Sequence, residues 1–143
     1  MRRDYSGDRG SLTLELVVWA PGLLLMIGLL TVAGRVNSAN AAVEQAAVDA
    51  ARTASSARST GAARDMAKAS VEKSLAVQGL QCTTTTIVLD TAGFGTRPGQ
   101  SATVTATVTC PVRLSDLAIP GLPGTRTVSY TATSSIDTFR ERT

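Results

Sequence analysis

The chain has 143 residues, of which 43% are hydrophobic, 17% are charged and only 3% are aromatic. Its net charge of +3 comes from scattered basic residues with no interleaved aromatic side chains, which argues against binding to nucleic acid. The absence of histidine removes the commonest general base and the commonest metal ligand, so the sequence predicts no enzyme, no metal and no other cofactor.

The first predicted element is a membrane-spanning helix. No charged residue occurs from Leu16 to Gly34, and a helix of that length rises roughly 28 Å, close to the thickness of the hydrocarbon core. The alternative is the core helix of a soluble domain, but a domain this small has no interior that could surround such a run. Arg2, Arg3 and Arg9 precede the span and favour a cytoplasmic N-terminus, whereas Arg35, directly after it, weakens that orientation.

The same helix is predicted to continue outside the membrane over residues 35–58, because no cap or breaker interrupts it. One of its faces carries almost only alanine, at Ala39, Val43, Ala46, Ala47, Ala50 and Ala54. Such a face suits close packing against another helix, and we expect it to pack against helices of a larger complex.

A second helix is predicted from about Ala62 to Val77, with Thr60 as its candidate N-cap. Small and apolar side chains again share one face, at Ala63, Met66, Ala67, Val71 and Leu75. Gly79 follows as a suitable C-terminal stop.

After Gly79 the composition changes to threonine and valine, which favours strands. Strands are predicted at Thr83–Leu89, Ser101–Cys110 and Thr125–Thr133, the second from its strict alternation of Thr with small apolar residues. Gly93-x-Gly95 lies between two strands and is interpreted as a hairpin loop, because a nucleotide-binding loop would need a helix next. Three antiparallel strands against one or two helices predict an α+β fold.

The two cysteines lie at strand ends, Cys82 before one strand and Cys110 at the end of the next. In a hairpin such positions can be neighbours, and an exported domain provides the oxidising environment for a disulfide. The alternative is a pair of free thiols.

Glu15 is the most informative residue for function. It directly precedes the uncharged span, where a carboxylate is costly unless it is paired or kept at the membrane interface. The simple interpretation is an interfacial charge favoured by the dipole at a helix N-terminus. Pro21, a few residues later, lacks an amide donor and is expected to kink or loosen the helix.

The start of the chain resembles the class III signal of type IV pilins and pseudopilins. The features are Asp8-Arg9-Gly10-Ser11, Thr13, Glu15 and Pro21 in front of and within an apolar helix. Within that class the first thirty-five residues or so resemble the TadE-like family of tight-adherence (Flp) pilus systems. Ser11 and Leu16 stand where classical type IV pilins and the major Flp pilin, respectively, have an aromatic residue, and a whole domain follows. The resemblance therefore implies a minor pseudopilin.

The resemblance implies a leader at residues 1–10, removed by a prepilin peptidase between Gly10 and Ser11. It further implies a membrane helix at 11–34, a helix extension at 35–58 and a small extracytoplasmic domain at 60–143. In this interpretation the new amine of Ser11 pairs with a Glu15 carboxylate in a helix bundle and sets the register. The partners would be membrane lipid and other pilins or pseudopilins, with the apolar and alanine-rich helix faces packing along a filament.

One rival is an ordinary secreted or surface-anchored protein, since Ala39-Asn40-Ala41 resembles a signal-peptidase site. The apolar run is longer than a usual signal core, and this site lies several residues beyond it. The sequence leaves open whether the family is TadE or its relative TadF, and whether the C-terminal domain binds a ligand as an adhesin would.

Overall fold

The computed structural model describes residues 9–113, 115 and 124–138, with the side chains of Val17 onward. It contains helices α1 (Arg9–Ser55) and α2 (Thr60–Val77) and strands β1 (Thr86–Asp90), β2 (Ala102–Arg113) and β3 (Thr125–Ile136), with a 3₁₀ turn, η1, at Ala92–Gly95. The strands form one antiparallel sheet in the order β1-β2-β3. The predicted α+β fold is confirmed.

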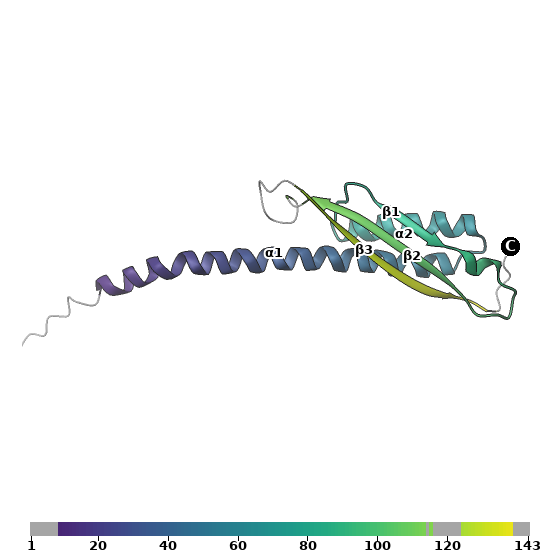
Figure 1. The fold of residues 1–143 in the computed structure, drawn as a ribbon, viewed down its shortest axis with the longest axis horizontal. Helices are drawn as coiled ribbons and strands as arrows, with labels where there is room; N and C mark the ends of the chain where they lie inside the picture. The colour runs from purple at the N-terminus through teal and green to yellow at the C-terminus, as the bar shows by residue number, and fades with distance from the viewer. Residues whose placement is uncertain (1–8, 114, 116–123, 139–143) are drawn as a thin grey trace, which may run out of the picture.

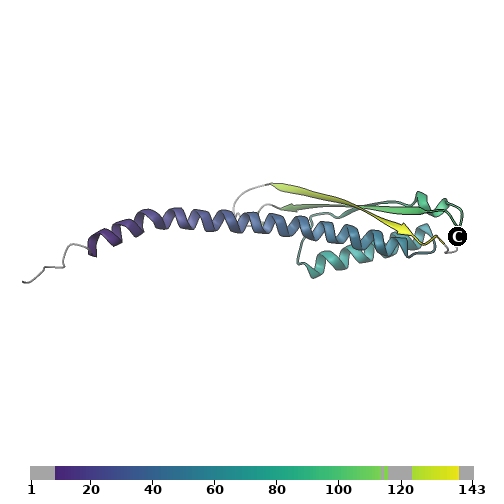
Figure 2. The same cartoon turned by 90° about the horizontal axis from the view of Figure 1, so that it is seen from below.

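The sheet and α2 gather on the C-terminal half of α1, while the N-terminal half of α1 projects away from the other described elements (Figure 1). Both helices lie on the same side of the sheet (Figure 2), and α1 packs against α2, β2 and β3. Strand β2 runs toward the projecting part of α1 and β3 runs back, so the strand ends at Arg113 and Thr125 lie nearest that part.

The alanine-rich face of α1 is buried within the chain's own domain. All six predicted positions are 3% exposed or less, and Ala42 and Ala51 are buried beside them because α1 is covered from two sides, by α2 and by the sheet. Alanine allows the helix axis to approach both neighbours closely. The prediction that this face packs closely against another helix is confirmed, but the helix is α2 of the same chain, so the expectation that the face packs along a filament is wrong.

Helix α2 begins earlier than predicted, at Thr60, and its N-cap is Ser59 instead of Thr60. Ser59 is extended, and its hydroxyl accepts a hydrogen bond from the Ala62 amide at 3.3 Å. The helix ends at Val77 as predicted, and Gly79, the predicted stop just beyond it, has a positive φ of 66°. The Gly79 amide donates to Ala76 and the Leu80 amide donates to Leu75, which is the Schellman pattern.

The alternation of small apolar residues with threonine along β2 determines which face of the sheet packs into the core. Its even-numbered residues from Ala102 to Val112 are all buried against the helices, and Val128, Ala132 and Ile136 of β3 join them. On the outer face, hydroxyl groups pair across the two strands: Thr105 with Thr133, Thr107 with Thr131, and Thr109 with Ser129, at 2.9–3.0 Å. The outer face therefore stabilises strand pairing with polar contacts while it faces solvent.

All three strands differ from their predicted bounds. Strand β2 continues through Pro111 to Arg113, because the Pro111 carbonyl points to the β1 side, where it accepts from the Thr83 amide at 2.9 Å. In an antiparallel strand the N–H and the C=O of one residue point to the same side. The position of the missing proline N–H therefore faces the β1 side, beyond the paired residues of β1, and no ladder bond to β3 is lost. Strand β1 is shorter than predicted and β3 extends to Ile136.

Candidate functional site

The candidate site is the projecting half of α1. Ten large apolar side chains between Val17 and Leu30 are each 52% exposed or more, and none of this apolar window is buried inside the molecule. A soluble core helix is therefore excluded for this segment. A helix that is apolar all round and has no partner among the described residues of its chain is typical of a membrane span, and α1 is long and apolar enough to be a single-pass anchor.

The predicted processing site and Glu15 lie at the start of α1. The helix begins at Arg9, so Gly10, Ser11 and Glu15 fall within its first turns, and their side chains lie outside the described residues. Ser11 and Glu15 are four residues apart, which is about one turn or 6 Å along the axis. The backbone therefore places them on one face of the helix, at the N-terminal edge of the apolar segment.

Helix α1 continues through Pro21. Because proline has no amide hydrogen, the Val17 carbonyl one turn earlier loses its helical hydrogen bond. The N-terminal half of α1 curves gently and does not break (Figure 2). Pro21 thus leaves one unbonded carbonyl in the apolar segment, close to Glu15.

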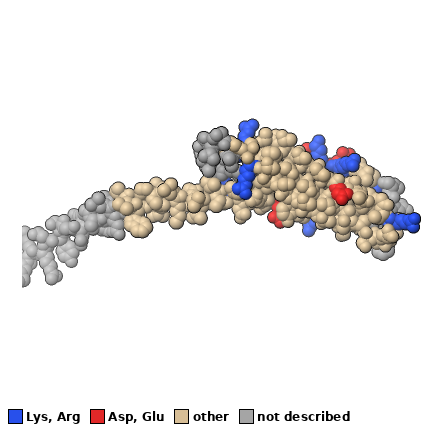
Figure 3. Space-filling view, viewed as in Figure 1, with Lys and Arg blue, Asp and Glu red and all other residues tan. Residues whose placement is uncertain are grey.

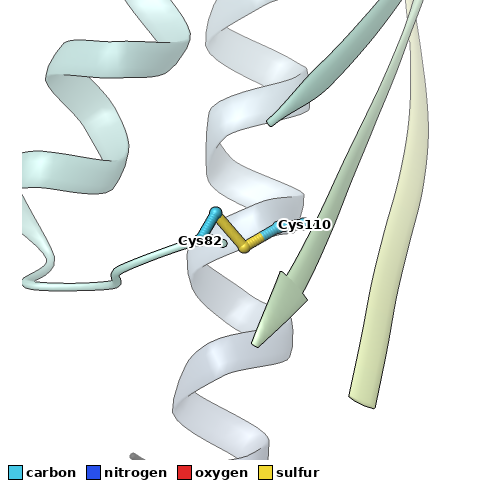
Figure 4. Close-up of a disulfide and its surroundings, with 2 residues drawn as sticks. All are labelled: Cys82 and Cys110. Atoms are coloured by element: carbon cyan, nitrogen blue, oxygen red, sulfur yellow. A yellow bond between two sulfur atoms is a disulfide. The ribbon is translucent and has the colours of Figure 1, made fainter. Parts of the chain in front are cut away.

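The predicted disulfide between Cys82 and Cys110 is confirmed, with Cα atoms 5.2 Å apart (Figure 4). Cys110 is fully buried on the helix-facing side of β2, while Cys82 lies half-buried in the connection between α2 and β1. The bond therefore fixes that connection to the central strand beside α1. In the chain-entropy model, closing a loop of this length stabilises the fold by about 3.6 kcal/mol.

Asp49 joins the two helices, a role that the sequence analysis missed. Its carboxylate accepts hydrogen bonds from Gln45 at 3.0 Å within α1 and from Ser74 of α2 at 3.1 Å, and Thr53 and Ser70 bond nearby at 3.3 Å. The spacing of Gln45 and Asp49 was a helical signal in the sequence, but their partner on α2 was not visible. With its lone pairs engaged in this way, Asp49 serves the α1–α2 contact.

A second link, between α1 and the sheet, comes from Glu44 and Tyr130. The hydrogen bond that the Tyr130 hydroxyl gives to the Glu44 carboxylate raises the pKa of Tyr130, and the negative charge of Glu44 raises it further. Tyr130 is 39% exposed on the helix-facing side of β3. The pair therefore fixes β3 at the level of Glu44 along the helix.

The alternative signal-peptidase site lies inside α1, which is helical without interruption from Arg9 to Ser55. Ala39 is only 3% exposed and Ala42, directly after the site, is 2% exposed, both in the domain core. Cleavage there would cut the helix at the point where it enters the domain.

No protein-family model, no curated protein and no solved structure matches the chain. Its function must therefore be inferred from the shape of α1 and the residues at its start.

Proposed function

We propose that this chain is a TadE-like minor pseudopilin that contributes to the assembly or priming of a tight-adherence pilus. The observation that carries the proposal is that one continuous helix, Arg9–Ser55, joins an exposed apolar half to a half built into the domain. A subunit of this form can be held in the membrane by its helix and then associate through the same helix with others of its kind.

The packing of α1 narrows the surface available for such association. The alanine-rich face is buried against α2 and the sheet, so pilins or pseudopilins would contact the helix through its projecting half. In a bundle of such helices Glu15 would be removed from water, and the amine freed at Ser11 would be its natural partner. Breaking such a pair leaves an uncompensated charge, which is strongly destabilising.

The competing function is a plain membrane anchor for a surface domain. In that case Glu15 is only an interfacial residue, and a neutral replacement would insert at least as well because it is cheaper in lipid. The two functions therefore predict opposite outcomes for one substitution.

The decisive experiment replaces Glu15 with Gln in the native host, which keeps the shape of the side chain and removes its charge. We expect membrane insertion and disulfide formation to persist, while piliation and co-purification of partner pilins are lost. Mass analysis of the mature protein should give an N-terminus at Ser11, whereas a secreted protein would begin near Ala42.

Glu72→Gln is the matched control, because Glu72 is an exposed carboxylate on α2, away from the apolar half of α1. It should leave piliation unchanged. Wild-type piliation and partner co-purification by the Glu15→Gln variant would contradict the pseudopilin function and leave the plain anchor.

A further inference from the structure

Three arginines lie at the end of the domain that is nearest the apolar half of α1. Arg35 is the first charged residue after the uncharged run of the helix, Arg113 is the last residue of β2 and Arg126 is the second residue of β3. All three are exposed. The two strand residues lie in adjacent register positions, with Arg126 opposite Val112 and Arg113 opposite Thr125.

Two contacts between α1 and β3 give the level of Arg126 along the helix. The hydroxyl groups of Ser55 and Ser134 lie 3.1 Å apart. Moving back along β3 from Ser134 to Arg126 covers about 26 Å, and moving back along α1 from Ser55 to Arg35 covers about 30 Å. The two arginines thus lie at one level to within a helical turn.

The second contact, between Glu44 and Tyr130, agrees more closely. From it, Arg126 lies about 13 Å back along the strand and Arg35 lies about 14 Å back along the helix. Arg113 belongs to the same level because Thr125, its partner in the register, is next to Arg126.

The arginines come from both faces of the sheet and from the helix. Arg126 shares the helix-facing side of β3 with Val128, Arg113 is on the outer side of β2, and Arg35 comes from the helix. Figure 3 shows basic side chains (blue) on the domain where it meets the projecting part of α1. Along α1, the first carboxylate beyond Arg35 is Glu44, about 14 Å farther into the domain.

We propose that Arg35, Arg113 and Arg126 bind the phosphate groups of anionic lipids in the leaflet from which α1 emerges. The inference rests on the membrane placement of α1 and not on the pilus role. The uncharged run of α1 fills the hydrocarbon core of the membrane. The three guanidinium groups therefore lie in the headgroup layer, which extends several ångströms beyond that core. Guanidinium pairs bidentately with phosphate, and binding by groups from both faces of the sheet and from the helix would hold the domain upright on the membrane.

The test uses the full chain reconstituted in bilayers of mixed phosphatidylcholine and phosphatidylglycerol. After mild detergent extraction, native mass spectrometry gives the ratio of the two lipids that stay bound. The wild-type chain should retain phosphatidylglycerol preferentially. Neutralising one arginine should lower that preference about fivefold, and the triple variant Arg35→Gln, Arg113→Gln, Arg126→Gln should lower it about a hundredfold.

The matched control neutralises three exposed arginines toward the opposite end of the domain, Arg58, Arg64 and Arg97, which removes the same net charge. It should retain the wild-type lipid ratio. An intact disulfide and an unchanged helical circular dichroism spectrum in both triple variants show that the domain is folded.

Two results would overturn the proposal. One is that the two triple variants give the same lipid ratio as each other, whether that ratio equals the wild-type value or is lower. Either outcome would show that the arginines nearest the apolar half of α1 have no special role in lipid binding. The other is displacement of phosphatidylglycerol by inorganic phosphate beyond that by chloride of the same ionic strength, which would indicate a site for free anions. No pilus component is present, so neither result bears on the Glu15 experiment.

Discussion

At the scale of single residues, Gly93 lies where the hairpin between β1 and β2 comes against the sheet. A Cβ atom added there would fall well inside contact distance of the Thr103 carbonyl oxygen and 3.1 Å from both the Thr103 amide nitrogen and Ile136 Cδ1. Two of these three neighbours are backbone atoms of β2, which cannot move without disturbing the ladder. The glycine is required by this close approach of two backbone segments.

Gly93→Ala should therefore destabilise the domain by about 1–3 kcal/mol, the usual cost of forcing extra volume into a packed site. Thermal unfolding of the full chain in detergent, followed by circular dichroism, measures the loss. Gly95→Ala is the control, because a Cβ atom at Gly95 meets nothing within 4 Å. Equal melting temperatures for the two variants would show that the hairpin does not pack as described.

Tyr130 gives the fold a dependence on alkaline pH. Its folded-state pKa is raised above its ordinary value, first by the hydrogen bond to Glu44 and then by the charge of Glu44. The folded state thus favours the neutral phenol, so its stabilising contribution is present below pH about 10 and is lost as pH rises through the raised pKa. Glu44→Gln should lower the Tyr130 midpoint in an ultraviolet absorbance titration, with Tyr130→Phe identifying the signal. An unchanged midpoint would contradict the contact.

At the scale of elements, regular patterns were predicted well and element ends were not. The alternation through Val104, Ala106 and Val108 and the alanine face of α1 identify buried faces without any knowledge of partners. Pro111 ended the predicted strand early, because whether a proline is tolerated depends on which neighbour its nitrogen faces. The Cys82–Cys110 pairing was predictable because the two residues lie near the same end of one hairpin, although Cys82 precedes β1 and Cys110 lies inside β2.

The partners of each face depend on contacts that are distant in the sequence. The alanine face was assigned to a larger complex, yet it packs within the chain against α2 and the sheet. The level of Arg126 beside Arg35 follows only from cross-element contacts such as that of Ser55 with Ser134. Neither arrangement has a local signature, since small residues suit any close neighbour and scattered arginines show no pattern until the sheet is placed on the helix.

The packing of α1 against the sheet can be tested with one enlarged side chain. Ala46 of α1 is fully buried in the core of the domain, whereas Ala41 on the same helix is exposed. Ala46→Leu should cost about 1–3 kcal/mol by overpacking, which lowers the melting temperature of a domain this small by roughly 4–8 °C per kcal/mol. Ala41→Leu should leave it nearly unchanged. A tolerated Ala46→Leu would place this face outside the core.

At the scale of the whole molecule, α1 joins the membrane anchor to the domain as one continuous helix. The helix runs without interruption from the exposed apolar segment into the buried alanine face. From residue 37 to Ser55 it spans about 27 Å inside the domain. Any bend where the two halves meet is therefore amplified at the far end of the domain.

Asn37→Pro tests whether function needs this helix to be continuous. Asn37 is exposed and lies two residues after Arg35, so its side chain supports no core contact. Proline there removes the hydrogen bond to the Ala33 carbonyl and bends the helix by 20° or more, which displaces the end of α1 by roughly 9 Å. The domain itself should still fold and form the Cys82–Cys110 bond, because its buried residues begin at Ala39 and only the half-buried Val36 packs against the core from before this position.

In the native host the Asn37→Pro variant should insert and accumulate normally but support little or no piliation. A subunit that must match neighbouring subunits at both its membrane helix and its domain cannot do so when the two are misaligned by several ångströms. Asn37→Ala, which keeps the helix straight, is the matched control and should support piliation at the wild-type level. Normal piliation by Asn37→Pro would mean that the helix serves as a tether, because a tether works at any angle.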